Sequence, residues 1–464
     1  MSNYKPTIGI EVHLELNTNA KVFSLSKNNY SDIANTNINE IDLAYPGVLP
    51  TFNKGVLNTA ILACLGLNMN ISRKMHFDRK NYYYPDLPKG YQITQFNTPI
   101  GLNGYLILSN GKKVGISDIH IEEDTCKSLH HNGKTLLNYN RCGVPLIEIV
   151  SCADMNSKEE AMDYAERLRE IMLYLGVSDC KIEEGSMRFD VNISVSKDDT
   201  LGVRSEIKNI GSISNIGDAI DYEIDRKIKA LENGEELVFE TRKFNANTGK
   251  TVFMRKKDTN NDYRYFPEPD IPYIYLEDED IITVKDKLVM LPKERREEYS
   301  KRGVSKVNIE KLIANKELSD YLNMFLEENI DFSIASNLLL GDISSYLNKK
   351  RISILETKLD KDRFIKVVNA LKNEEISSKI FKEILINIME DDTLDIDKHK
   401  QVNSDEEIIK VVERVLNDYP DSVKDYKNGK SNAIKFLMGM CMKESGGKLN
   451  PKMVMDILQE LLNK

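Results

Sequence analysis

The sequence lacks several features that would assign it to a class of protein at once. Its six cysteines are scattered and none belongs to a Cys-x-x-Cys pair, which excludes a disulfide framework and indicates reduced thiols in the cytosol. Cys142 and Cys152 are open to two interpretations, as nucleophiles or as buried thiols. No apolar run approaches the roughly 20 residues of a membrane span, and no basic region precedes an apolar segment at the N-terminus. We therefore expect a cytoplasmic protein with no membrane partner.

The usual motifs of nucleotide-binding and hydrolytic enzymes are also missing. Neither G-x-x-x-x-G-K-[ST] nor G-x-G-x-x-G occurs, so an ATP site would have to be built in another way. The absence of a G-x-S-x-G elbow removes support for hydrolysis by an activated serine. The net charge of -9, from 73 acidic and 64 basic residues, argues against a protein coated in nucleic acid. It leaves room for a local basic site.

The chain of 464 residues is too long for one compact core. Alternation of apolar and polar residues dominates from residue 7 to about 290, and helical periodicity dominates from about 294 onward. An acidic stretch at 389–407 divides the helical part. We therefore predict three domains, at 1–292, 293–395 and 396–464.

Two helices are predicted within the first domain. Ser157 can cap the first helix, with Glu160 three positions later, and the apolar stripe of this helix ends at Gly176. The second helix is expected at about 217–233, with an isoleucine-rich stripe. Both patterns are typical of helices that pack on a sheet.

The polar side of the predicted strands is the most informative feature. In TIGIEVHLEL the aliphatic residues alternate with Glu11 and His13, so these two side chains share one face. ISDIHIEED adds His120 and Glu122 in the same way. Glu148 interrupts the aliphatic strand PLIEIVS, where a buried carboxylate needs a cation nearby. Two further strands, MRFDVNISV and VRSEIKN, contribute Asp190, Glu206 and Lys208.

Two interpretations of this face remain open. An antiparallel sheet with one solvated face explains the presence of any one of these polar residues. Together, however, His, Asp and Glu are suitable ligands for a hard divalent ion such as Mg²⁺. A metal that neutralises phosphate would make the face a site of phosphoryl transfer or ligation.

Two tyrosine-rich stretches are unusual for scaffold. They read FDRKNYYYPDLPKGYQ at 77–92 and NDYRYFPEPDIPYIY at 261–275. Basic side chains there can hold phosphate or carboxylate, and tyrosines offer hydroxyls or ring faces to a polar ligand. An edge strand with an aromatic girdle also explains the first stretch, and a rigid interdomain loop the second. The candidate binding residues are Arg79, Lys80, Tyr82, Tyr84, Asp86 and Lys89, and in the second stretch Arg264, Glu268 and Asp270.

At these motifs the sequence resembles the GatB family, the B subunits of the bacterial aspartyl/glutamyl-tRNA(Asn/Gln) amidotransferases. The resemblance runs from end to end through IGIEVHLEL, FDRKNYYYPDLPKGYQITQ, HIEEDTCKS, NRCGVPLIEIVS, EEGSMRFDVNIS, RSEIKNIGS, DYRYFPEPDIP and GKLNPKMV. It implies an α+β fold, with a cradle-like mixed-sheet domain of the amidotransferase/glutamine synthetase-like kind. All-helical middle and YqeY-like tail domains would follow.

The resemblance also implies a heterotrimer, in which the two partners would be an amidase and a small accessory protein that braces the complex. This chain would use ATP and Mg²⁺ to phosphorylate the side chain of misacylated Glu-tRNA(Gln) or Asp-tRNA(Asn), and ammonia from the amidase would displace the phosphate. The tail would grip the tRNA, which fits the six lysines and three acidic residues from 429 onward. The tail lysines that we assign to tRNA are Lys430, Lys435, Lys443 and Lys448.

Residue by residue, the resemblance implies a metal set and an ammonia path. The metal would lie among Glu11, His13, Glu123 and Glu148, with Asp190 and Glu206 close by. Lys80 and Lys89 would line the path that brings ammonia in. Strand parity, in contrast, places Glu122 rather than Glu123 with His120, so both glutamates are candidates. The catalytic candidates are therefore Glu11, His13, Glu122, Glu123, Glu148, Asp190, Glu206 and Lys208.

One departure from the family concerns zinc. Many relatives carry two cysteine pairs where this chain has Ser24, Ser26, Asn39 and Asp42. These residues offer no thiolate, so we expect no structural zinc. The loop would then be held by packing and hydrogen bonds. Two rival functions are a non-catalytic scaffold that binds tRNA and a metal-dependent phosphotransferase that acts on a small molecule.

Overall fold

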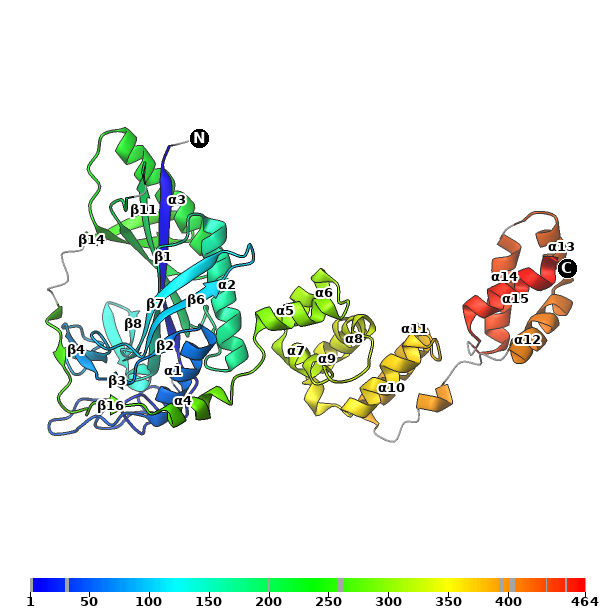
Figure 1. Ribbon diagram of the computed structural model, residues 1–464, viewed down its shortest axis with the longest axis horizontal. Helices are drawn as coiled ribbons and strands as arrows, with labels where there is room; N and C mark the ends of the chain where they lie inside the picture. Colours follow the sequence, from blue (N-terminus) through cyan, green and yellow to red (C-terminus); the bar gives the residue numbers. More distant parts are fainter. Residues whose placement is uncertain are drawn as a thin grey trace. The chain divides into compact units, whose positions relative to one another are not determined.

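The computed structural model describes residues 3–29, 33–198, 200–256, 263–391, 396–399, 405–430, 432–446 and 449–463. The chain forms two compact units, Met1–Pro292 and Lys293–Lys464. The first unit combines a large sheet with helices and the second is helical, so the predicted α+β fold class is confirmed (Figure 1). The predicted boundary at 395/396 touches residues 392–395, which lie outside the described residues.

One large sheet organises the first unit. Among the described residues, nine strands pair in the order β14-β13-β12-β11-β1-β10-β7-β6-β2. Neighbouring strands are antiparallel, except that β12 and β13 are parallel. The strands are β1 (Lys5–Glu15), β2 (Asn70–Ile71), β6 (Gly101–Ile107), β7 (Lys113–Glu123), β10 (Pro145–Ser151), β11 (Met187–Ser196), β12 (Ser205–Ile210), β13 (Glu240–Asn245) and β14 (Lys250–Lys256).

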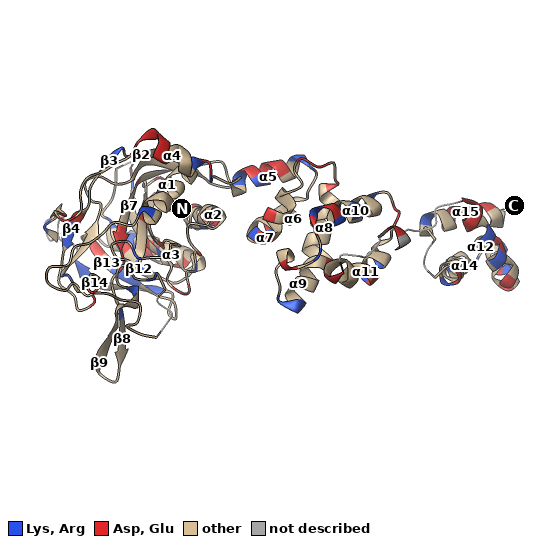
Figure 2. Ribbon diagram, turned by 90° about the horizontal axis from the view of Figure 1, so that it is seen from below, with Lys and Arg blue, Asp and Glu red and all other residues tan. Residues whose placement is uncertain are grey.

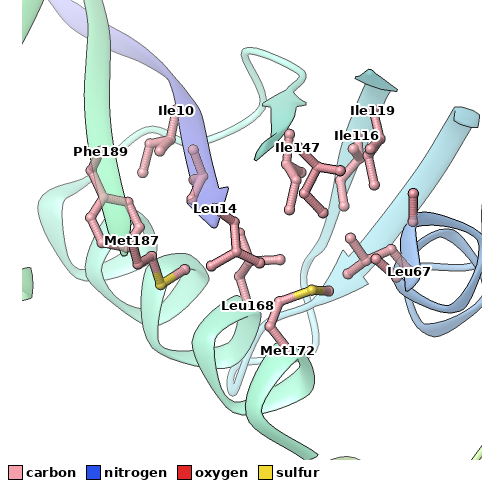
Figure 3. Close-up of a cluster of buried hydrophobic side chains, with 14 of the residues drawn as sticks. Ile10, Leu14, Leu67, Ile116, Ile119, Ile147, Leu168, Met172, Met187 and Phe189 are labelled. Carbon is pink, nitrogen blue, oxygen red and sulfur yellow. The ribbon is translucent and has the colours of Figure 1, made fainter. Parts of the chain in front are cut away.

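The two faces of this sheet have opposite character. On β1 the alternate residues Ile10 and Leu14 are at most 1% exposed, and helices α2 (Lys158–Leu175) and α3 (Ile213–Glu232) pack on their side of the sheet. Figure 3 shows Leu14 beside Leu168 of α2. Each such side chain contributes about 1.5–3 kcal/mol of burial free energy. The other face of β1, which carries the acids, is therefore free to form a site.

The predicted helices were partly correct. Ser157 caps α2 by accepting a hydrogen bond from Glu160 N at 3.2 Å, and Gly176 ends the helix in the left-handed conformation, as predicted. Helix α3 starts four residues before the predicted 217, because Ser212 caps it. Its buried face includes Glu223 and not only the predicted isoleucine stripe.

The expectation of only two helices in the first unit was wrong. Helix α1 (Lys54–Gly66) and helix α4 (Asp278–Lys285) are also present. Asn53 caps α1 by accepting a hydrogen bond from Gly55 N at 2.8 Å. The apolar run in α1 is short and largely buried, and such a run looks alike as helix or strand by periodicity alone.

Small sheets complete the first unit. The two tyrosine-rich stretches meet in one of them, with the order β15-β4-β5. Figure 2 shows the hairpin of β8 and β9 projecting from the rest of the unit. The short strands are β3 (Lys74–Met75), β4 (Asp78–Asn81), β5 (Tyr91–Thr94), β8 (Lys127–His131), β9 (Lys134–Asn138), β15 (Phe266–Pro267) and β16 (Ile274–Tyr275).

The second unit consists of helices, and the last four described helices share a hydrophobic core of their own. Within the described ranges, no helix is both long and apolar enough to cross a bilayer. The helices are α5 (Pro292–Lys301), α6 (Lys306–Ala314), α7 (Lys316–Asn323), α8 (Phe332–Leu338), α9 (Ser344–Lys350), α10 (Lys361–Lys372), α11 (Ser378–Glu390), α12 (Asp405–Asp418), α13 (Pro420–Lys427), α14 (Asn432–Glu444) and α15 (Pro451–Asn463).

Candidate active site on the polar face of the sheet

Strand pairing gathers the predicted acids and histidines on the polar face. His13 on β1 lies opposite Glu148 on β10, and Glu148 lies opposite His120 on β7. Two residues along β1, Glu11 lies opposite Asp190 on β11. Directly opposed residues of antiparallel strands carry their side chains on the same face. The register therefore brings together residues that are far apart in the sequence.

These side chains line a cavity of about 510 Å³, which we call the main cavity. Six carboxylates and four lysine or arginine side chains line it, so the acidic side chains outnumber the lysines and arginines by two. A bound cation would reduce that excess. The charged lining residues are Glu11, Asp118, Glu122, Glu148, Asp190, Glu206, Lys80, Arg204, Lys208 and Arg255.

Two triads on this face have the composition of cation sites. In each triad the three ligand atoms lie within 4.8 Å of one another. Carboxylate oxygens are the ligands that Mg²⁺ prefers, so the five carboxylates of the two triads fit that ion, whereas His13 offers a nitrogen. The first triad is His13, Glu122 and Glu148, and the second is Glu11, Asp190 and Glu206.

His120 acts as a cation beside the first triad. Its Nε2 lies 2.8 Å from Glu148 Oε2, and its Nδ1 lies 3.3 Å from Asp118 Oδ1. Burial disfavours the imidazolium, but Glu148 and Asp118 outweigh burial and raise the pKa of His120 to about 10. Burial likewise opposes ionisation of Glu148, yet His120 and His13 hold its pKa well below the usual range. A charged His120 therefore orients Glu148 within the triad.

Negative charge is crowded at the second triad. Burial raises the pKa of Glu11 and the nearby Glu148 raises it further, although Asn192 Nδ2 donates a hydrogen bond to Glu11 at 2.8 Å. Lys208 Nζ contacts Asp190, and this partner raises the pKa of Lys208 against the effect of burial. Crowded carboxylates of this kind are where a bound cation would relieve repulsion.

The structure places Glu123 outside both triads, contrary to the metal set implied by the resemblance. Successive strand residues point to opposite faces, so Glu122 lines the main cavity and Glu123 does not. The Glu123 carboxylate lies 2.6 Å from Lys89 Nζ and accepts a hydrogen bond from Ile93 N at 2.9 Å. Glu122 therefore replaces Glu123 in the candidate metal set.

A second cavity of about 200 Å³ is lined by Lys89 and Glu123, whereas Lys80 lines the main cavity. The two lysines predicted for one path thus belong to different cavities. Burial raises the pKa of Tyr82, and the charges of Glu122 and Glu123 raise it further. Tyr82 therefore lies within electrostatic range of carboxylates from both cavities.

The Arg79 guanidinium forms ion pairs with Glu268 and Asp270. Its Nε and Nη2 donate to the Glu268 carboxylate at 2.7 and 2.8 Å, and Nη2 also donates to Asp270 Oδ2 at 3.0 Å. Asp86 accepts a hydrogen bond from a threonine hydroxyl at 3.2 Å, and Tyr84 is 59% exposed. Arg79, Asp86 and Tyr84 are not among the described residues that line the main cavity.

Several lining residues escaped the sequence analysis. Phe96 stacks on Tyr265 with ring centroids 4.1 Å apart, and Lys80 Nζ lies 5.1 Å from the ring centroid of Tyr263. Gln95 Nε2 is buried without a partner in the described structure, which suits it to hold a substrate oxygen. The aromatic run at 263–266 was a usable signal for the tyrosines. No local signal pointed to Gln95 or Phe96.

A buried ion pair closes the loop that contains Ser24, Ser26, Asn39 and Asp42. Lys21 is fully buried and its Nζ lies 3.1 Å from Asp42 Oδ2. Asp42 also accepts hydrogen bonds from Ser24 Oγ at 2.7 Å and from Asn39 N at 3.1 Å, and Ser26 N donates to Ser24 Oγ at 3.3 Å. Asp42 thus joins both ends of the loop.

The cysteines raised as nucleophiles show no activation. Cys142 is 2% exposed, and burial raises the pKa of its thiol to about 12 despite the nearby Lys89. Burial also raises the pKa of Cys152, and Asp154 adds to the effect. A reactive cysteine requires a lowered pKa, so the structure favours the interpretation as unreactive thiols.

Comparison with known proteins identifies the family. The model of the GatB/GatE catalytic domain matches residues 6–282, and that of the GatB domain matches residues 320–462. Proteins named as the B subunit of aspartyl/glutamyl-tRNA(Asn/Gln) amidotransferase from Staphylococcus haemolyticus, Staphylococcus saprophyticus and Ligilactobacillus salivarius are 42%, 41% and 41% identical, with 100% of both chains covered. The chain therefore belongs to the GatB family, the B subunits of the aspartyl/glutamyl-tRNA(Asn/Gln) amidotransferases.

Proposed function

We propose that this chain catalyses ATP-dependent transamidation of misacylated Glu-tRNA(Gln), Asp-tRNA(Asn) or both. It would act in a heterotrimer with an amidase and a small accessory protein. The names of its relatives supply the substrates and the role as one component of a larger enzyme. The observation that carries the catalytic part is the main cavity, where two carboxylate-rich triads lie beside Lys80 and Lys208.

The chemistry explains why such a cavity is needed. A carboxylate does not accept ammonia until one oxygen becomes a good leaving group. The side-chain carboxylate oxygen would attack the γ-phosphorus of ATP, and the bond from that phosphorus to the β-phosphate oxygen would break to release ADP. Ammonia would then attack the acyl carbon, the C–O bond to phosphate would break, and one ammonia proton would pass to the departing phosphate.

Named residues can perform the binding in these steps. Lys80 stays charged because Glu122 raises its pKa against the effect of burial, and Lys80 and Lys208 would hold phosphate oxygens. Gln95 Nε2 would donate to a substrate oxygen. Mg²⁺ held by the two triads would supply neutralisation of phosphate charge.

Ammonia would enter from the second cavity. Lys89 and Glu123 line that cavity, Lys80 lines the main one, and Tyr82 lies within electrostatic range of both carboxylates at the end of β7. We assign the path to the end of β7, between Glu122 and Glu123.

The tail would bind the tRNA through phosphate contacts. Lys430, Lys435 and Lys443 are exposed on or near α14, and Lys448 lies outside the described residues. Such contacts give affinity without reading the bases.

Reconstitution of the complex with the amidase and the small accessory protein tests the proposal. The assay measures amide formation on both misacylated tRNAs, with glutaminase activity as the internal control. We expect His13→Ala and Glu148→Gln to lower amide formation by about 100-fold and to leave glutaminase activity intact. His131→Ala, which alters an exposed histidine of the hairpin, is the matched control. A normal rate in His13→Ala would remove the triad from the mechanism.

The same assay separates the rival functions. A non-catalytic scaffold would bind tRNA but would show no dependence on the triads. A small-molecule phosphotransferase would turn over ATP with this chain alone and without tRNA. The main cavity favours the transamidation proposal because it combines cation ligands with charged lysines.

A further inference from the structure

A single turn of the chain forms one wall of the main cavity. After β5 ends at Thr94, the chain continues through residues 95–99, which we call the wall turn. Gln95, Phe96 and Pro99 of the wall turn line the main cavity. His76 and Asp78, which hold this turn, are not among the described residues that line it. Any role of these two residues in the reaction would therefore act through the wall turn.

Asp78 contacts the backbone of the wall turn with its carboxylate. The residue is 0% exposed, and on β4 it lies opposite Thr94. Its Oδ2 accepts hydrogen bonds from the backbone N–H groups of Phe96 at 2.9 Å and Asn97 at 3.0 Å, and its Oδ1 accepts one from Asn97 Nδ2 at 3.0 Å. Burial of a carboxylate is unfavourable unless hydrogen bonds compensate for the lost water. Asp78 therefore fixes two successive residues of the wall turn.

His76 holds the wall turn one residue further along. Its backbone N–H donates a hydrogen bond to Thr98 Oγ1 at 2.8 Å, and its Nδ1 lies 3.1 Å from the same oxygen. On the other side of the imidazole, Nε2 lies 3.2 Å from Asp78 Oδ1. Because the ring contacts both the threonine and the carboxylate, His76 and Asp78 form one clamp on residues 96–98.

The clamp determines where Gln95 and Phe96 lie. Gln95 is 1% exposed, its Oε1 accepts a hydrogen bond from Ile121 N at 3.0 Å, and its Nε2 is buried without a partner in the described structure. A backbone N–H only donates, so the amide oxygen must face Ile121 and the amide nitrogen is left for a ligand. Phe96, which Asp78 holds directly, stacks on Tyr265. A displaced wall turn would therefore move both a free donor and an aromatic contact.

We propose that Asp78 is a positioning residue for amide formation, which acts through the wall turn and holds Gln95 Nε2 at the main cavity. This inference rests on the proposed function. Positioning affects the rate strongly, because a misplacement of about 1 Å can cost about 100-fold even when the substituted residue is far from the reacting atoms. His76 supports the same turn through Thr98.

Asp78→Asn tests the clamp with a minimal change of shape. If the remaining oxygen still accepts from the two backbone N–H groups, the new amide nitrogen faces Asn97 Nδ2, and two donors cannot pair. We expect the wall turn to shift and amide formation by the reconstituted complex to slow about tenfold. Gln95→Glu keeps an oxygen for Ile121 N and removes the Nε2 donor, so it should also slow the reaction about tenfold.

A double-mutant cycle distinguishes positioning from simple stabilisation. If Asp78 acts through Gln95, Asp78→Asn/Gln95→Glu should be about tenfold slower than wild type, instead of showing the roughly 100-fold product of two independent effects. Glu223→Gln is the matched control, because Glu223 is also a fully buried carboxylate but lies on α3. Its effect and that of Gln95→Glu should multiply. Glutaminase activity and circular dichroism report assembly and folding of every variant.

The outcomes separate the positioning role from the proposed function. A 100-fold loss in the double variant, or a normal rate in Asp78→Asn, would overturn the positioning role and leave the proposed function standing. A normal rate in Gln95→Glu would also overturn it, since the clamp would then place no functional donor. Absence of amide formation by the wild-type complex would overturn the proposed function and the positioning role with it. If Asp78→Asn does not fold, Thr98→Val, which removes the acceptor of His76 N, replaces it in the cycle.

Discussion

Asp42 should be more sensitive to substitution than Lys21, its partner in the buried ion pair. Lys21 is fully buried and its Nζ lies 3.1 Å from Asp42 Oδ2. Asp42 also accepts hydrogen bonds from Ser24 Oγ and Asn39 N, whereas a further acceptor of Lys21 is a carbonyl oxygen 3.4 Å away. The two ends of the pair are therefore not equivalent.

The contacts give the magnitude of this difference. Removing one partner of a buried ion pair costs about 3–5 kcal/mol. In Lys21→Met the remaining carboxylate keeps two donors, so we expect a loss of about 3 kcal/mol. Asp42→Ala leaves the lysine unpaired and removes two hydrogen bonds worth about 1 kcal/mol each, which gives about 5 kcal/mol. The double variant Lys21→Met/Asp42→Asn buries no charge and should lose only about 1–2 kcal/mol.

Urea unfolding followed by circular dichroism measures these free energies. Hydrogen exchange of peptides from residues 17–53 shows whether the loss is local to the loop. Lys54→Met, at an exposed lysine, is the control and should change the free energy by less than about 0.5 kcal/mol. In a buffer without Mg²⁺, addition of EDTA should not shift the midpoint. A greater loss in Lys21→Met than in Asp42→Ala, or a double variant no more stable than Asp42→Ala, would refute the reasoning.

Three other predictions concern a buried lysine, the ammonia path and the tail. Burial lowers the pKa of Lys227 from 10.5 to about 8, so the unfolded chain binds more protons between these pH values and stability should rise with pH across that window. Lys227→Met should remove up to about 3 kcal/mol of this rise, as measured by urea unfolding at pH 8 and pH 10. Lys89→Met should reduce amide formation from glutamine in the complex more than from added ammonium chloride, and equal loss with both donors would contradict the path. Changing Lys430, Lys435 and Lys443 to Ala should raise the tRNA Michaelis constant and lower the salt slope of binding by about 3, whereas unchanged tRNA affinity would contradict the assignment.

The polar face could be predicted because successive side chains of a strand point to opposite faces of the sheet. The position of a residue in the strand therefore determines its face. Glu11 and His13 share a face by parity, and the antiparallel register then places Asp190 and Glu148 opposite them. Parity also selected Glu122 over Glu123 for the main cavity, against the expectation from the resemblance. On β7 the alternation of side chains therefore located Glu122 on the face that lines the main cavity.

Helix α3 shows where local patterns fail. Its isoleucines predicted the packing face, yet Glu223 and Lys227 are fully buried. Glu223 forms ion pairs with Arg226 of the same helix and with Arg242 of β13, and Lys227 Nζ donates to a backbone carbonyl at 2.9 Å. Most of these partners come from other strands and loops, so no helical period could reveal them.

Contacts between segments that are distant in the sequence could not be predicted from local patterns either. Arg79 and Glu268 are 189 residues apart, and their ion pair links the two tyrosine-rich stretches. Both tyrosine-rich stretches were recognised as unusual, but only the sheet of β15, β4 and β5 shows that they belong to one structure. Their composition pointed to a ligand, and the structure adds that Arg79 holds the two stretches together.

The consecutive residues Glu122 and Glu123 explain how one strand can serve two parts of the proposed reaction. Glu122 lines the main cavity, where we propose phosphoryl transfer, and Glu123 lines the second cavity beside Lys89. Because successive strand residues point to opposite faces, the proposed arrangement would hold ammonia near Lys89 apart from the phosphates. Tyr82 lies within electrostatic range of both carboxylates at the end of β7. A substitution that shifts the register of β7 by one residue would exchange the two glutamates and should disable both functions together.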